Sequence, residues 1–142
     1  MKKQLFLLSC AIGMTLIPVK AQDDDKEKTP LGKQMEAVSD AFKAFRKETD
    51  PVKGAALART AQQGALKAAL EVPAVVKEMP EGPEKVKAAV EYRKMMGKLF
   101  ISLCEVEEAF INGKPEEVAK IVGNLKEMKK SGHEKFMKED EH

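Results

Sequence analysis

The spacing of its helix breakers is the feature that most constrains how this chain can fold. Four stretches, at about 31–47, 51–72, 84–111 and 115–140, are rich in helix-forming residues, and prolines, glycines and an asparagine separate them. None of them alternates polar and apolar residues as a strand would. Because short connections make successive helices antiparallel neighbours, the sequence predicts an all-α fold, an antiparallel up-down-up-down four-helix bundle.

The N-terminus predicts an export signal outside the fold. Lys2 and Lys3 precede an apolar run at residues 5–19, and small or apolar residues follow at a cleavage position near Ala21. This run is too short to be read as a membrane span. We therefore expect residues 1–21 to be a signal peptide, with no stable membrane insertion after its removal and a periplasmic location in a cell with two membranes.

The part that remains after cleavage is expected to be a disordered acidic leader at residues 22–29 and one bundle domain at 30–140. Cleavage leaves 22 basic and 23 acidic residues, so the formal charge of +2 for the whole chain becomes −1. The basic balance of the precursor is therefore no argument for nucleic acid as a partner. Cys104 is then the only cysteine, which excludes an intramolecular disulfide. We expect a monomer.

The second stretch has the least regular pattern. Its larger apolar residues, Val52, Leu66 and Leu70, form a weak seam with Ala56 that Arg59 interrupts. We expect this seam to face the core. The many alanines and glycines of the same stretch also indicate that a neighbouring helix approaches closely.

The first and last stretches each carry a metal-binding side chain among their apolar positions. Met35 lies in the heptad-like seam of the first stretch, and His133 shares a face of the last one with Phe136. In an up-down bundle, the start of the first helix and the end of the last lie at one pole, next to the long loop at 73–83. Both side chains are therefore expected to point inward at the same end of the bundle.

A methionine sulfur and a histidine nitrogen that face each other can be the two axial ligands of a haem iron. Each residue also has an ordinary explanation, since methionine fills cores and a histidine near a helix C-terminus interacts with the helix dipole. These residues alone leave both readings open. If a haem lies at this pole, the side chains expected to cover its faces are Leu31, Val38, Leu70, Tyr92, Met96 and Phe136.

Other chemistries find little support in the sequence. Covalent c-type haem needs Cys-x-x-Cys-His, but Lys129 and Gly132 stand at the two cysteine positions before His133. The chain has two histidines, and the second, His142, lies in the tail, so a zinc site is poorly supported. No nucleophile–base pair or phosphate-binding glycine loop stands out, and we do not expect an enzyme.

Over roughly residues 30–137, the chain resembles the cytochrome b562 family. The resemblance depends on the turn and the His-x-Lys-aromatic ending of the last stretch, the opening of the first, and an aromatic–arginine pair in the third. In this sequence these motifs are Gly113-Lys114, His133-Glu-Lys-Phe136, Leu31-x-x-x-Met35 and Tyr92-Arg93.

The resemblance implies one non-covalent b-type haem per chain, with Met35 and His133 as axial ligands. Lys129 departs from the family pattern, because it stands where the family has an arginine near the haem edge, and it is included among the expected cofactor-binding residues. The function implied is electron transfer between redox partner proteins by an exported cytochrome. The alternative is a haem-free periplasmic helical-bundle chaperone or stress-binding module, whose adaptable surface contacts would be Met95, Met96, Met128 and Met137.

Overall fold

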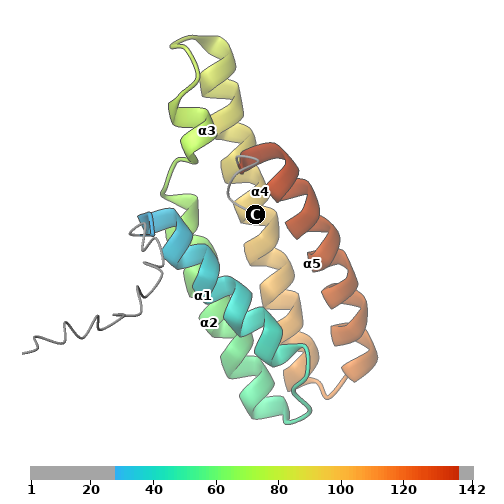
Figure 1. Ribbon diagram of the computed structural model, residues 1–142. Helices are drawn as coiled ribbons and strands as arrows, with labels where there is room; N and C mark the ends of the chain where they lie inside the picture. The colour runs from blue at the N-terminus through green and yellow to red at the C-terminus, as the bar shows by residue number, and fades with distance from the viewer. Residues whose placement is uncertain (1–27, 138–142) are drawn as a thin grey trace, which may run out of the picture.

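The computed structural model describes residues 28–137, and every regular element in this part of the chain is a helix (Figure 1). Four long helices run side by side, and a short one lies in the connection between the second and the third of them. They are α1 (Pro30–Phe45), α2 (Pro51–Ala69), α3 (Ala74–Lys77), α4 (Pro83–Ile111) and α5 (Pro115–Phe136). The predicted all-α four-helix bundle is confirmed.

Three of the expected segments fall partly or wholly outside this range. The signal peptide, the leader as far as residue 27, and the last residues of the expected domain, 138–140, lie outside the described residues. Among the helices of residues 28–137, none is both long and apolar enough to cross a membrane.

Proline and glycine set the ends of the long helices, as the breaker pattern predicted. Each long helix has proline in its first turn, where the missing N–H costs no hydrogen bond. Thr29 Oγ1 accepts a hydrogen bond from the Gly32 N–H at 3.0 Å and so caps α1. After α4, Gly113 adopts φ +64°, a left-handed conformation in which glycine is favoured and which reverses the chain into α5.

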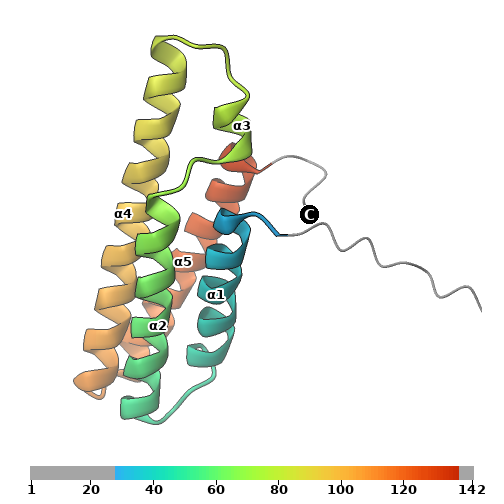
Figure 2. The same ribbon diagram turned by 90° about the vertical axis from the view of Figure 1, so that its left-hand side faces the viewer.

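The short helix α3 was not expected. It lies between Pro73 and Pro80, and its four residues are too few to show an apolar period in the sequence. It packs against α4 and α5, and Val76 is buried there. Figure 2 shows the beginning of α4 projecting past the other long helices, with α3 beside it.

The buried face of α2 is not the predicted one. Val52 is 80% exposed, Leu66 52% and Leu70 85%, so the expected seam faces solvent. The buried residues of α2 are instead mostly small, namely Gly54, Ala55, Ala58, Ala61, Gln62, Gly64, Ala65 and Ala68. The close helix approach that these small residues predicted is therefore confirmed, and it explains why the larger residues turn outward.

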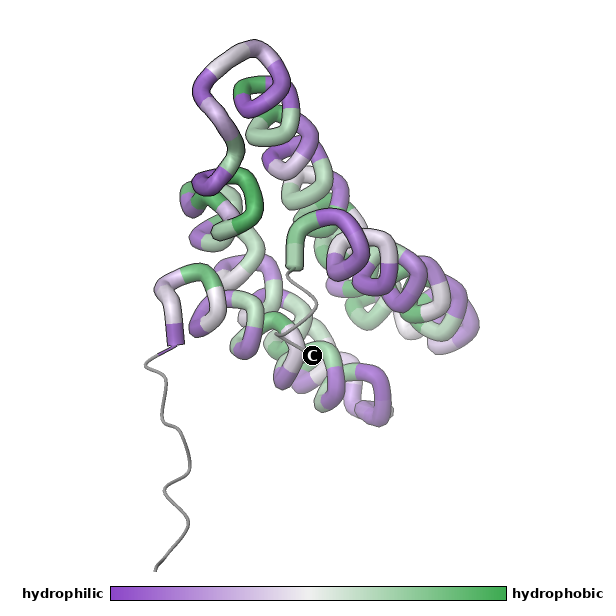
Figure 3. The backbone as a smooth tube through the Cα atoms, turned by 45° about the horizontal axis from the view of Figure 1, so that its top comes forward, coloured by the Kyte–Doolittle hydropathy of each residue, from purple (hydrophilic) through white to green (hydrophobic). Residues whose placement is uncertain are grey.

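Two glycines show how close this approach is. A Cβ atom on Gly54 would lie 2.3 Å from ring atoms of Phe110 on α4, and one on Gly64 would lie 2.7 Å from Cγ2 of Val38 on α1. Since neither contact leaves room for a methyl group, α2 packs tightly against both neighbours. Hydrophilic residues mark the outer side of the bundle, most plainly along α5 (Figure 3).

A polar link joins α2 to α4 halfway along the bundle. The buried amide of Gln62 donates to the Leu103 carbonyl at 3.2 Å and to Glu107 Oε2 at 2.6 Å. Arg59 also pairs with Glu107. The hydrogen bonds from Gln62 and Arg59 hold the pKa of Glu107 below its usual value. This network satisfies the buried amide and helps to set the register of the two helices.

The long helices do not form a closed ring. Helix α1 packs on α2, α2 on α4 and α4 on α5, whereas no Cα atom of α1 lies within 8 Å of one in α5. The bundle is therefore wider between its first and last helices than between its other neighbours.

Candidate functional site

A pocket of about 420 Å³ lies on this wide side, at the pole where α1 begins and α5 ends. Its walls come from α1, α4, α5 and the segment 71–77, which includes α3. A volume of this size is in the range of small-molecule and cofactor sites, roughly 300–1,000 Å³. The open edge of the bundle is thus the candidate ligand site among the described residues.

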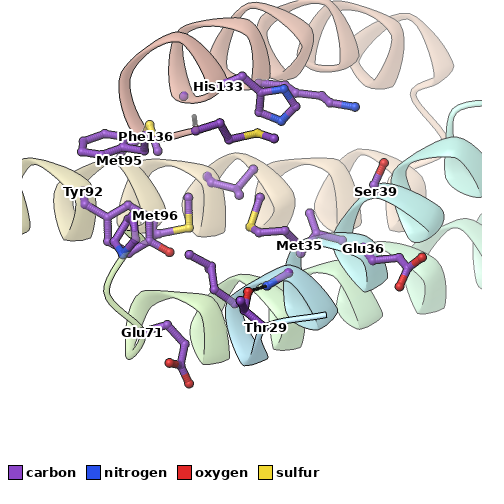
Figure 4. Close-up of a pocket in the computed structure, with 18 of the residues that line it drawn as sticks. Thr29, Met35, Glu36, Ser39, Glu71, Tyr92, Met95, Met96, His133 and Phe136 are labelled. Carbon is purple, nitrogen blue, oxygen red and sulfur yellow. Dashed lines mark hydrogen bonds between the residues drawn. The ribbon is translucent and has the colours of Figure 1, made fainter. Parts of the chain in front are cut away.

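Met35 and His133 both line this pocket and are partly buried. Figure 4 shows the Met35 thioether reaching in from α1 and the His133 imidazole from α5. The cap at Thr29 sets the start of α1 six residues before Met35. His133 lies in the last turn of α5, where its carbonyl accepts a hydrogen bond of 3.0 Å from the Met137 N–H. The sequence correctly expected these two residues at one pole, although a role in haem binding is a separate matter.

Six of the seven other expected site residues line the same pocket. They are Leu31, Val38, Tyr92, Met96, Lys129 and Phe136. Leu70 does not, and this placement was wrong. Helix α2 ends at Ala69, and the face it buries holds its small residues, so Leu70 projects into solvent with 85% of its surface exposed.

Tyr92 connects three helices at the base of the pocket. Its hydroxyl donates a hydrogen bond of 2.8 Å to the Ala68 carbonyl near the end of α2, and its ring packs edge-on against Phe136 of α5 with 5.4 Å between centroids. Burial, with a smaller effect from Glu71, raises the pKa of Tyr92 to about 12. Tyr92 is therefore neutral across the physiological range and holds this end of the bundle together.

The sequence missed part of the sulfur-rich lining. Met95, Met128 and Met137 line the pocket, although the alternative reading had placed them on an exposed contact surface. Leu99 and Phe42 line it as well. Because α1 and α5 stay apart, these apolar side chains line a pocket on the wide side of the bundle. The available signal was the pair Met95-Met96 in the third stretch and the two methionines of the fourth, Met128 and Met137.

Charged residues lie at the margin of the pocket. Lys77 and Lys129 are exposed at its edge, and Glu36 and Glu71 also contribute to its wall. Cationic side chains at the edge of an apolar pocket can pair with the carboxylates of a bound ligand.

The donor set limits the kind of metal centre that fits. Within residues 28–137, no group of three or more histidine, cysteine, aspartate or glutamate side chains could hold a metal ion. The Met35 thioether and the His133 imidazole, on separate helices of a largely apolar pocket, instead fit a planar cofactor that supplies the other ligands of its own metal. Haem with two axial protein ligands is such a group.

One comparison with known proteins bears on this geometry. A family profile described as cytochrome b562 matches residues 30–137, which covers all five helices and every pocket-lining residue except Thr29. No curated protein matches the chain.

Proposed function

This chain belongs to the cytochrome b562 family, a family of haem-binding electron carriers, and on that premise we propose that it transfers electrons through one non-covalent b-type haem held between Met35 and His133. The observation that carries the proposal is the placement of these two side chains in one pocket, on helices that face each other across the wide side of the bundle.

The two ligands determine the kind of chemistry that is proposed. Bound haem would supply a one-electron redox couple, and ligation by both Met35 and His133 would leave no open position for oxygen or substrate. This arrangement suits outer-sphere electron transfer rather than catalysis. A thioether ligand also raises the reduction potential of a haem relative to a more electron-donating ligand.

The remaining pocket residues have supporting roles in this proposal. Leu31, Val38 and Met96 provide apolar cover that excludes water, and the Tyr92–Phe136 ring pair closes the base. The haem propionates would lie toward the exposed edge, where Lys77 and Lys129 offer ammonium groups for charge-assisted hydrogen bonds.

We further propose that the protein works in the periplasm. Residues 1–21 have the positive start, apolar centre and small-residue end of a signal peptide. The partners would be exported redox proteins, and the chain would act as a monomer with one haem.

Titration of the purified protein with haemin, with spectra of the oxidised and reduced forms, tests the function. We expect saturation at one haem per chain and a sharp low-spin reduced spectrum. Met35→Ala and His133→Ala should each abolish the low-spin spectrum, because each removes an axial ligand. Met79→Ala is the matched control, since Met79 lies in the connection before α4 and does not line the pocket.

Two outcomes would overturn the proposal. No saturable binding would favour the haem-free chaperone or stress-binding module. Tight binding that is unchanged in Met35→Ala, with an open sixth position, would favour a haem carrier or gas-binding protein.

A further inference from the structure

Methionines gather at one place in this molecule. Five of the six in residues 28–137 line the pocket, and the sixth, Met79, does not. The proposed haem ligation needs one of them. The five come from three sides of the pocket. Met35 is on α1, Met95 and Met96 are on α4, Met128 is on α5, and Met137 directly follows α5.

Three of these methionines, Met35, Met95 and Met96, line the same pocket as His133, the one histidine among residues 28–137. Figure 4 shows the thioethers of Met35 and Met96 directed into the pocket from α1 and α4, with the His133 imidazole entering from α5. Met96 is buried, with 3% of its surface exposed. The sulfur of Met95 packs against Gly132, the neighbour of His133, since a Cβ atom there would lie 3.2 Å from it.

The donor groups directed into the pocket are thioethers and an imidazole (Figure 4). Glu36 and Glu71 line the wall, but their carboxylates are directed away from the sulfur atoms (Figure 4). Thioether sulfur and imidazole nitrogen favour Cu(I), whereas Ca²⁺ and Mg²⁺ prefer carboxylate and carbonyl oxygen. If the methionines were only apolar filler, leucine would serve equally well at these positions.

We propose that the pocket, when it holds no haem, binds one Cu(I) ion through a ring nitrogen of His133 and the sulfurs of Met35 and Met96, with Met95 as a further donor. Copper would use both proposed haem ligands, so the two cofactors exclude each other. The inference does not depend on the haem proposal, because it needs only the donors present in the pocket.

The test is an anaerobic titration with Cu(I) in competition with a chromogenic Cu(I) chelator. It uses the full chain with Cys10→Ser and Cys104→Ser, which removes the two thiols as rival soft ligands. We expect one Cu(I) per chain. Met96→Leu should weaken binding by roughly tenfold or more, and Met95→Leu added to it should weaken it further, since even outer-shell partners of a metal contribute roughly 10–100-fold. Met79→Leu is the matched control and should bind as the parent does.

A second readout uses Ag(I), a diamagnetic substitute for Cu(I), and protein labelled with carbon-13 at the methionine methyl groups. The Met35 and Met96 methyl signals should shift on addition of Ag(I), and that of Met79 should not. Circular dichroism confirms that each variant is folded. Failure to compete with the chelator, or equal affinity in Met96→Leu and Met79→Leu, would overturn the inference. Copper binding in a protein that fails to take up haemin would uphold it and refute the haem proposal.

Discussion

Gly64 controls how closely α1 approaches α2 beside the pocket, and its replacement links packing to the site. A Cβ atom at this position would lie 2.7 Å from Cγ2 of Val38 and 3.2 Å from the backbone oxygen of Gln34. Val38 lines the pocket, and Gln34 directly precedes Met35. We predict that Gly64→Ala pushes α1 outward and destabilises the protein, although alanine is the better helix former.

The magnitude follows from two opposing contributions. Alanine in place of glycine within a helix gains about 1 kcal/mol, whereas overpacking a well-filled contact costs roughly 1–3 kcal/mol. Gly97 of α4 is the matched control, because a Cβ atom there has no neighbour within 4 Å. Gly97→Ala should keep the gain without the cost. The two variants should therefore differ by roughly 1–3 kcal/mol in free energy of unfolding, with Gly64→Ala the less stable.

Urea unfolding of the haem-free protein, followed by circular dichroism, measures this difference. For a domain of this size, 1 kcal/mol corresponds to a change of about 4 °C in Tm, so thermal unfolding offers an independent check. Equal stability of Gly64→Ala and Gly97→Ala would refute the argument that α2 uses glycine to admit α1.

Three other substitutions test separate parts of the structure. Tyr92→Phe removes the hydrogen bond to Ala68 and should lower the free energy of unfolding by about 1 kcal/mol at pH 7. The pKa of Tyr92 is raised to about 12 in the folded protein, so the unfolded chain loses this proton at lower pH. The Tm of the wild type should therefore fall more steeply than that of Tyr92→Phe between about pH 10 and 12. Parallel plots of Tm against pH for the two proteins would contradict this. Hydrogen bonds lower the pKa of Glu107 below its usual value of 4.5, so the stabilisation from the ionised carboxylate is present above that pH and is lost on acidification. The wild type should therefore lose more stability than Glu107→Gln as the pH falls below 4.5. Equal acid sensitivity of the two proteins in urea unfolding would contradict this prediction. Leu70→Ser should change stability by less than about 0.5 kcal/mol and leave haemin affinity unaltered, because Leu70 is 85% exposed; a large loss of affinity would return Leu70 to the site.

The four long helices could be predicted from the sequence because each begins at or next to a proline, and the first three end before a breaker. The same reasoning placed Met35 and His133 at one pole, since an antiparallel chain of four helices must bring its first and last ends together. These conclusions depend on connectivity and on strong local signals. They do not depend on which side chains interlock.

The errors arise where helix packing overrides apolar size. In the segment that contains α2, hydrophobicity alone favours burying Leu66 and Leu70. However, Phe110 packs directly against Gly54 and Val38 against Gly64, so only small residues fit on the buried face of α2. The face of α2 that carries the small residues is therefore buried. For the same reason Leu70 faces solvent and does not line the pocket as expected.

The extent of the pocket was also beyond the sequence pattern. An amphipathic seam predicts a closed bundle, whereas α1 and α5 stay apart. The wider opening exposes Met95, Met128 and Met137 to the pocket. The short helix α3 lacks enough residues to show any periodicity.

The most direct test of the account is a crystal structure of the protein grown with equimolar haemin. The account predicts one haem between α1 and α5, with its iron bonded to the sulfur of Met35 and to a ring nitrogen of His133. Haem bound elsewhere, or in this pocket with either residue unbonded to iron, would contradict it.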